Sequence, residues 1–337
     1  MSATSDHITA ITREVILPGL QDNYFSGSPT WKWMWERRKT LDGGYTIDWT
    51  FNDTRSYNAQ NVNYFQQYLV KPPSFAKRAS IDFVDKVAPV TLSKTEIKKI
   101  TGETGLINYV EDTMKRELMS FDKMMSAELF GSGRSTAHPI FNALPAQTPI
   151  AGLDLIVAAG RTYAGHDSTS NALLDSYVKT INPTEFADLY DPAAASFLPD
   201  AMTEVLNETE HFQGESVDWI STTKIMREAL QRAGYREAVS GVIIKQDGSR
   251  YDLGVKAITF EGIPVVKDWD CGAGKMYCLE SNTLYIACLK GAEMTFEDFQ
   301  DNSGGDAIVA NWKLSCQVIC LEPRRQGKIT GGSSTRT

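Results

Sequence analysis

The stretch LDGGYTIDWTFN, residues 41–52, decides the fold when it is combined with the run ETGLINYVEDTMKRELMSFDKMMSAELFG, residues 103–131. The first stretch opens with a turn signal, Leu41-Asp42-Gly43-Gly44, and then alternates apolar and polar residues. Its apolar positions are Tyr45, Ile47, Trp49 and Phe51. This is the period of a β-strand with one covered face.

A returning arm with the same alternation follows, with Ala79, Ile81 and Phe83 on one face. The stretch Thr91 to Ile100 is expected to continue this arm less regularly. A two-stranded ribbon is marginal in water unless something packs on it. The apolar face of the predicted hairpin therefore needs either the protein's own core or a neighbouring subunit, and the pattern leaves both open.

Residues 102–131 predict one uninterrupted amphipathic helix. The apolar positions recur at spacings of four and seven: Leu106, Val110, Met114, Phe121, Met125 and Leu129. Charged residues face away, and Gly131-Ser132-Gly133 is a C-cap signal. At about 1.5 Å per residue the helix would be on the order of 40 Å long, which suits the spine of a domain.

The rest of the chain mixes the two patterns and predicts an α+β fold. Helices are expected at Ser168–Thr180, Ala201–Asn207 and Thr222–Ala233. Strands are expected at Val239–Lys245, Tyr251–Thr259, Ile263–Lys267, Met276–Leu279, Leu284–Leu289 and Ala307–Glu322. The segment Arg324–Thr337 has too little apolar content to fold alone.

The N-terminal part predicts an extended arm, Ile8–Tyr24, broken by Pro18-Gly19. Trp31, Trp33 and Trp35 follow at alternating positions. Three exposed indoles would promote aggregation, so these side chains must be covered by the parent domain or by another subunit.

Composition is that of a globular chain, with 42% hydrophobic residues and a mean hydropathy of -0.28. No apolar run approaches the length of a membrane helix, and residues 1–10 lack the pattern of a secretory signal. The net charge of -8 and pI near 5.2 argue against a protein that binds nucleic acid over a large surface, because phosphate neutralisation needs clustered cations.

Candidate catalytic and metal-binding residues form no recognisable site. The five cysteines have no Cys-x-x-Cys spacing, which favours buried thiols, and the four histidines are scattered. The run Asp268 to Lys275 has Gly272 where a calcium loop needs Asp or Asn, and Trp269 where a phosphate loop needs Gly. A glycine-rich turn between two strands is the better interpretation, and we expect no catalytic residue, no cofactor and no metal.

Several segments together resemble the major capsid proteins of tailed bacteriophages, whose shared architecture is the Hong Kong 97 fold. The segments that carry the resemblance are the start Ile11–Pro18, the hairpin entry Leu41–Gly44, the stretch Glu261–Asp268 leading into Met276–Leu279, and the closing Ala310–Lys313. The resemblance covers nearly the whole chain, and it lies in the order and general character of the predicted elements more than in a diagnostic motif.

The resemblance implies a division of the chain into named parts. Residues 1–40 correspond to an N-terminal arm, 41–95 to an extended β-hairpin loop, and 96–148 with 296–330 to a peripheral domain with a spine helix at about 103–131. Residues 149–295 correspond to an axial domain and 331–337 to a polar tail.

The resemblance also implies a structural protein rather than an enzyme. Such chains assemble into hexamers and pentamers of an icosahedral phage head that encloses double-stranded DNA without sequence-specific binding. The chain would then be a virion component without membrane contact, assembled in the host cytoplasm with a portal, and with decoration proteins where the shell uses them. No long charged helix precedes the arm, so any scaffolding is expected from a separate protein.

In this family the extended loop lies across a neighbouring subunit, which would complete the apolar face of the hairpin. Residues chosen by position as intersubunit contacts are Trp49, Arg55, Tyr57, Lys77, Arg78, Glu111 and Arg116. Some relatives crosslink their shells through a loop lysine, for which Lys71, Lys77 and Lys86 are the candidates here. Without an assignable catalytic carboxylate, we expect noncovalent closure.

The acidic balance of the chain predicts an inner shell surface that does not bind DNA strongly. Two other hypotheses stay open. A cellular nanocompartment shell of the same fold would need a cargo-docking groove, and a soluble enzyme or binding protein would need a cleft with converging titratable residues.

Overall fold

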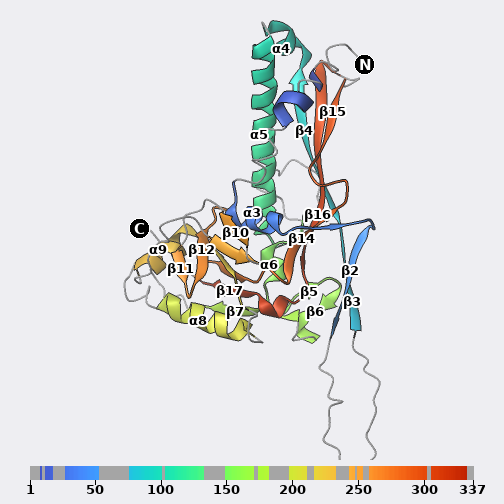
Figure 1. Cartoon of the computed structure of the whole chain (residues 1–337). Helices are drawn as coiled ribbons and strands as arrows, with labels where there is room; N and C mark the ends of the chain where they lie inside the picture. The colour runs from blue at the N-terminus through green and yellow to red at the C-terminus, as the bar shows by residue number, and fades with distance from the viewer. Residues whose placement is uncertain are drawn as a thin grey trace, which may run out of the picture.

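The computed structural model describes residues 8–9, 12–17, 27–52, 76–100, 103–132, 149–170, 174–181, 197–210, 216–232, 243–246, 249–252, 258–301 and 305–331. Within these ranges the chain forms a long helix packed along a five-stranded sheet, a six-stranded sheet carrying further helices, and a two-stranded ribbon. Figure 1 shows the long helix α5, Glu103–Leu129, extending upward from the body and the ribbon running along one side of the body, next to β5 (Thr162–Tyr163) and β6 (His166–Asp167).

The predicted spine helix is confirmed as α5, Glu103–Leu129. Val110, Met114 and Met125 are fully buried along one side, as the apolar spacing requires. The helix ends where the Gly131 N–H bonds to the Glu128 carbonyl at 2.9 Å. Only glycine fits at Gly152, because a Cβ there would lie 2.1 Å from the Gly131 carbonyl oxygen.

The five-stranded sheet is organised by β16, Ala307–Cys320. One edge of β16 pairs with β4, Val84–Ser93. Its other edge pairs with β15, Thr295–Asp301, and then with β14, Leu284–Leu289. The short β1, Lys39–Leu41, extends the sheet beyond β14 in parallel. Every second residue of β4 is buried, and Figure 1 shows α5 running alongside β4, β15 and β16.

The six-stranded sheet has the order β11-β12-β8-β13-β17-β7. Its strands are β11 (Ile258–Phe260), β12 (Ile263–Lys267), β8 (Trp219–Thr222), β13 (Met276–Leu279), β17 (Gly327–Thr330) and β7 (Tyr177–Thr180). Both β12 and β13 pair with β8. The turn from Asp268 to Lys275 therefore crosses β8 rather than joining neighbouring strands.

The six-stranded sheet separates two hydrophobic cores. Ile220, Val265 and Met276 point into the core beneath the helices α8, Phe197–Thr209, and α9, Lys224–Arg232. The alternate residues Trp219, Val266 and Tyr277 belong to the larger core shared with α5 and the five-stranded sheet. Because successive side chains of a strand point to opposite faces of the sheet, β8, β12 and β13 each contribute residues to both cores.

Smaller elements complete the fold. They are the ribbon strands β2 (Thr46–Asn52) and β3 (Ala76–Asp82), the hairpin of β5 (Thr162–Tyr163) and β6 (His166–Asp167), the hairpin of β9 (Ile243–Gln246) and β10 (Ser249–Asp252), the helices α3 (Pro29–Glu36), α4 (Lys94–Lys99) and α6 (Leu153–Ile156), the π-helical turn Thr12–Ile16, and the 3-10 turns Ser168–Ser170 and Pro323–Arg325.

The extended interpretation of Ile8–Tyr24 is wrong for its described residues, because Thr12–Ile16 is helical. The indoles at alternating positions also lie in a helix, Pro29–Glu36. The Ser28 side chain accepts a hydrogen bond from the Trp31 N–H, and Pro29 occupies the first helical turn. Both are helix-start signals that outweigh the alternation of indoles. Trp31 and Trp33 are fully buried in the parent core.

Two further expectations are wrong. The stretch Thr91–Ile100 leaves the strand at Ser93, which caps α4 by accepting from the Glu96 N–H. The helix predicted at Ser168–Thr180 is a 3-10 turn followed by the strand β7. The segment Arg324–Thr337 was predicted not to fold alone, and its strand β17 forms by pairing with β13 and β7.

The strands predicted at Ile263–Lys267, Met276–Leu279 and Leu284–Leu289 are confirmed as β12, β13 and β14. The late strand is confirmed as β16, and helices lie at the second and third predicted positions as α8 and α9. All five cysteines are buried thiols. In the described part of the chain, no helix is both long and apolar enough to cross a membrane.

Candidate assembly surfaces

The predicted hairpin is confirmed as an antiparallel ribbon in which Ile47 faces Ile81 and Trp49 faces Ala79. Its apolar face is covered by the protein itself. Ile47 packs on Ala287 and Ile319 of the five-stranded sheet, and the Trp49 ring lies 6.2 Å from the Tyr163 ring.

The β5–β6 hairpin anchors the ribbon. Its two-residue turn places Ala164 at φ 50° and Gly165 at φ 83°, the conformation of a tight hairpin turn. The Ala164 carbonyl accepts from the Ser80 N–H at 3.4 Å, and His166 Nε2 lies 2.8 Å from the Arg78 carbonyl. The Phe51 ring meets the His166 ring edge-on at 5.0 Å.

These contacts decide between the two coverings that the pattern left open. For the described residues of the ribbon, the chain itself buries Ile47 and Ala79, so the apolar face does not depend on assembly alone, whereas Trp49 and Ile81 stay half-buried. The covering hairpin has no strong sequence signal, since Ala164 replaces the Asn or Asp that such a turn favours. Its turn is held by the ribbon instead.

The opposite face of the ribbon is polar and exposed. Arg78 Nη2 lies 2.5 Å from Asp48 Oδ2, and 71% of the Arg78 side chain remains accessible. The hydrogen bond from Arg78 lowers the pKa of Asp48 from its ordinary value. This face is available to a partner.

The predicted interface residues divide into two groups. Trp49, Lys77 and Arg78 lie together on the ribbon, whereas Glu111 and Arg116 lie on α5, on the other side of the molecule in Figure 1. Trp49 is half-buried against its own chain, and Lys77 and Arg78 are exposed. Arg55 and Tyr57 lie outside the described residues.

On α5, Glu111 is half-buried and pairs with Lys115 at 2.5 Å, one helical turn away. Arg116 is exposed. Met119, on the same solvent-facing part of the helix, is 73% accessible. The helix therefore presents a mixed charged surface rather than an apolar one.

Tyr45 is an exposed aromatic that sequence reasoning placed on the covered face. It is 95% accessible, although its carbonyl accepts from the Phe83 N–H at 3.2 Å and so continues the ladder of the ribbon. Gly43 and Gly44, with φ values of 145° and 113°, precede it.

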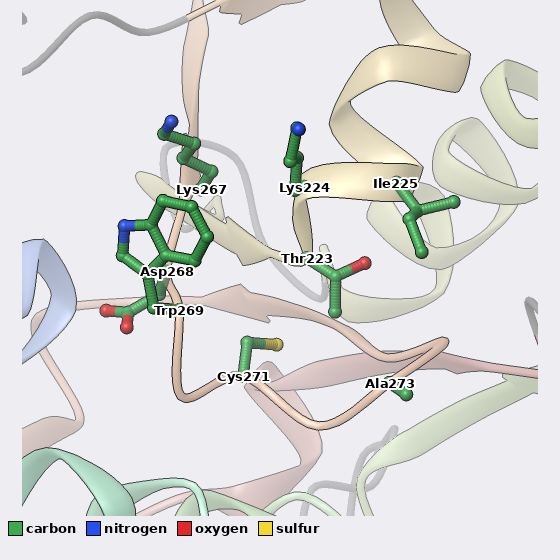
Figure 2. A pocket seen from close by; sticks show the side chains of 8 residues that line it. All are labelled: Thr223, Lys224, Ile225, Lys267, Asp268, Trp269, Cys271 and Ala273. Carbon is green, nitrogen blue, oxygen red and sulfur yellow. The ribbon is translucent and has the colours of Figure 1, made fainter. Parts of the chain in front are cut away.

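A shallow pocket of about 220 Å³ lies beside the turn from Asp268 to Lys275, and Figure 2 shows the side chains that line it. Trp269 is 73% accessible at its rim, with Lys267 Nζ 5.0 Å from the indole centroid. Asp268 turns away from solvent and accepts from the Ser28 hydroxyl at 2.6 Å. Burial raises the pKa of Asp268, although the hydrogen bonds from Ser28, Asp270 and Thr30 oppose the shift.

Two charged clusters hold the elements in place. Asp154 accepts from Lys275 at 2.8 Å and from Lys328 at 3.0 Å, which joins α6 to β17 and to the start of β13. Lys86, on β4, pairs with Glu128 of α5 at 2.8 Å, with 5% and 12% of their side chains accessible. Glu128 also accepts from the Ile150 N–H at 3.1 Å.

The Lys86–Glu128 ion pair bears on the crosslinking candidates. Because Lys86 is buried and paired within its own chain, it is not positioned to reach a neighbouring subunit. Lys77 is exposed on the ribbon, and Lys71 lies outside the described residues.

Comparisons with solved structures reveal the same fold in shell proteins. The capsid protein in the cyanophage A-1(L) capsid asymmetric unit superposes with a TM-score of 0.63 at 18% identity, covering 90% of this chain and 93% of that one. The capsid of Myoviridae phage XM1 gives a TM-score of 0.51 at 8% identity, covering 88% of this chain and 90% of that one.

A cellular shell is also similar. The holo-SrpI encapsulin complex from Synechococcus elongatus PCC 7942 gives a TM-score of 0.51 at 12% identity, covering 89% of this chain and 86% of that one. No family model and no curated sequence matches. The chain therefore has the α+β, Hong Kong 97-like capsid fold, as its resemblance implied.

Proposed function

We propose that this chain is a major capsid protein that assembles into the hexamers and pentamers of an icosahedral phage head around double-stranded DNA. The observation that carries the proposal is the similarity of fold to the cyanophage capsid protein over nine-tenths of the chain. A similarity confined to one small part of the chain is excluded, because the match covers 90% of this chain and 93% of that one.

The geometry supports assembly through the ribbon's polar face. The apolar face is fixed to the parent chain by Tyr163, His166 and β16, so the ribbon is held in one orientation. Its exposed face offers Arg78 and Asp48 to a neighbour. A heterologous contact of this kind closes into rings when repeated about an axis.

We further propose the division into arm, extended loop, peripheral domain and axial domain, with boundaries adjusted by strand pairing. The five-stranded sheet and α5 would form the peripheral domain, which would include β4 and β14. The six-stranded sheet would form the axial domain, which would include β17. These pairings support moving 84–93 and 284–289 to the peripheral part and 327–330 to the axial part.

The proposed setting is a virion, with assembly in the host cytoplasm, a portal, and separate scaffolding or decoration proteins where the shell uses them. Noncovalent closure and an inner surface that does not retain DNA stay predictions. The burial of Lys86 leaves two of the three crosslinking candidates, so an SDS-resistant ladder from denatured particles would point to Lys71 or Lys77.

The first test is light scattering after size exclusion, with electron microscopy of the excluded fraction. We expect rings or closed shells of the 37.4 kDa chain. A chain that stays monomeric over a range of concentration and salt, also with candidate scaffolding proteins added, would contradict the proposal.

A matched pair of variants locates the contact. Arg78→Ala removes an exposed cation paired with Asp48, and Lys290→Ala removes an exposed cation paired with Asp42. Because surface ion pairs contribute little to stability, both variants should unfold like the parent chain. We expect Arg78→Ala alone to reduce the assembled fraction, and equal assembly by the two variants would remove Arg78 from the interface.

The second candidate function is a cellular nanocompartment shell, favoured by the similarity to the encapsulin. Particles isolated from the natural source separate the two. A phage head contains long nuclease-protected DNA, whereas a nanocompartment contains folded protein cargo without it.

A further inference from the structure

Two of the five cysteines face each other across the five-stranded sheet. Cys288 of β14 stands opposite Cys316 of β16 in antiparallel register. Both are fully buried thiols. They lie in the larger core with Ile286 and Val318, which form the neighbouring cross-strand pair on the same face.

The hydrogen bonding of the ladder fixes how close the two cysteines come. The Leu321 N–H donates to the Thr283 carbonyl at 2.8 Å, so Thr283 and Leu321 form a hydrogen-bonded pair of the ladder. The next pair, Leu284–Cys320, is therefore a non-hydrogen-bonded pair. Pair types alternate along an antiparallel ladder, and Cys288–Cys316 lies four residues further along. It is therefore also a non-hydrogen-bonded pair.

Non-hydrogen-bonded pairs bring side chains together on one face with Cα atoms about 4.5 Å apart. A disulfide spans Cα separations of roughly 4.4–6.8 Å. The two thiols can thus be joined without a change in register. The other cysteines have no such partner: Cys278, for example, stands opposite Gly327.

We propose that Cys288 and Cys316 are a redox pair that peroxide oxidises to an intramolecular cross-strand disulfide. One thiolate attacks the peroxide O–O bond, which forms a sulfenic acid and releases hydroxide. The second sulfur displaces water from that sulfenic acid, and the S–S bond forms. Two thiols lose two electrons and two protons in total, and hydrogen peroxide is reduced to two waters.

Burial controls when this reaction takes place. Desolvation raises the pKa of Cys288 to about 12 and raises that of Cys316 well above its ordinary value. Because the thiolate is the nucleophile, the closed structure reacts slowly, and reaction proceeds through local openings of β14. Reducing cytosol keeps the dithiol, so the disulfide would mark chains exposed to an oxidising medium.

The disulfide would tie β14 to β16 and enclose β15 between them. Closing this loop restricts the unfolded chain, so we expect the oxidised form to unfold several degrees higher than the reduced form. The inference does not depend on the proposed function, because it concerns the folded chain in any assembly state.

The test treats the reduced full chain with hydrogen peroxide, blocks remaining thiols with an alkylating agent in denaturant, and maps peptides by mass spectrometry. We expect loss of two of the five thiols together, a single linked peptide joining Cys288 to Cys316, and a higher unfolding temperature that a reductant reverses. A parallel reaction in urea below the unfolding transition should be faster, since it increases local opening.

Matched variants separate the pair from general thiol oxidation. Cys288→Ala and Cys316→Ala should each abolish the linked peptide and the thermal shift, whereas Cys278→Ala, at an equally buried thiol, should keep both. Peptide mapping of the parent chain needs no variant to fold. Separate sulfinic acids, linked peptides between chains, or five unreacted thiols even in urea would overturn the proposal.

Discussion

Lys86 and Lys115 each form an ion pair with a glutamate of α5, but the first pair is buried and the second is exposed to solvent. The Lys86–Glu128 pair is almost fully buried, whereas the Lys115–Glu111 pair leaves 52% and 36% of its side chains accessible. Losing one partner of a buried pair leaves an uncompensated charge. An exposed pair one helical turn apart contributes little.

The two lysines therefore form a matched test. Lys86→Met is expected to lower the free energy of unfolding by about 3–5 kcal/mol, and Lys115→Met by about 0.5 kcal/mol or less. Urea denaturation of both variants measures the difference. Equal losses would mean that Glu128 is compensated by its bond from Ile150 and that Lys86 does not fasten α5 to β4.

Asp154 predicts a dependence of stability on pH. Burial raises its pKa, but the charged hydrogen bonds from Lys275 and Lys328 outweigh burial, so the net shift is below the ordinary value of 3.8. A carboxylate with a lowered folded pKa stabilises the fold above its unfolded pKa, and this contribution is lost as pH falls through the folded pKa.

Asp154→Asn should therefore lower the free energy of unfolding by roughly 1.5–3 kcal/mol at neutral pH. The deficit relative to the parent chain should shrink as the pH falls below about 4, where Asp154 of the unfolded chain becomes protonated, and onward through the lower folded pKa. Urea denaturation at a series of pH values measures this difference in the free energy of unfolding, with Asp42→Asn as a control at an exposed carboxylate. A deficit that is constant down to pH 2.5 would contradict this role for the charge.

At the scale of elements, β17 occupies the interior of the six-stranded sheet, between β13 and β7. It packs so closely beneath α8 that a Cβ at Gly327 would lie 2.3 Å from Val205 Cγ1. Removing this strand would leave two facing strand edges without partners and open the core beneath α8.

Two truncations test the placement of β17. A chain ending at Arg325 lacks the strand and should be insoluble or unfolded by circular dichroism. A chain ending at Gly331 keeps it and should melt like the full chain. Similar behaviour of the two truncated chains would show that β17 is dispensable.

Elements with strong local patterns were predictable from the sequence. The spacing of Val110, Met114 and Met125 predicted α5, and the alternation through Ile47 and Trp49 predicted the ribbon. The helix of the tryptophan segment was not predictable, because the alternating positions of the indoles indicate a strand whereas Ser28 and Pro29 indicate a helix start. The strands β7 and β17 have weak patterns of their own and form because neighbouring strands supply their hydrogen bonds.

The candidate surfaces were predictable only in part. Position along the chain placed Lys77, Arg78 and Arg116 on exposed faces, as the structure has them. It could not reveal that Trp49 packs on Tyr163, because this contact joins segments more than a hundred residues apart. Tertiary contacts of that range have no local signal.

At the scale of the whole molecule, the chain moves repeatedly between the two sheets. It leaves the five-stranded sheet after β4, builds most of the six-stranded sheet, returns for β14, β15 and β16, and adds β17 to the six-stranded sheet. The core that α5 and the five-stranded sheet share includes Trp219 and Tyr277 from the six-stranded sheet. The two sheets are therefore interdependent parts of one folding unit.

The interior position of β17 has a consequence for synthesis on the ribosome. β17 is translated after every other described strand. Until it emerges, the edges of β13 and β7 that pair with it have no hydrogen-bond partner. Unpaired edges recruit other strands readily, which makes this interval the time of greatest exposure to chaperones and to wrong partners. A nascent chain can therefore complete its six-stranded sheet only after β17 has left the exit tunnel.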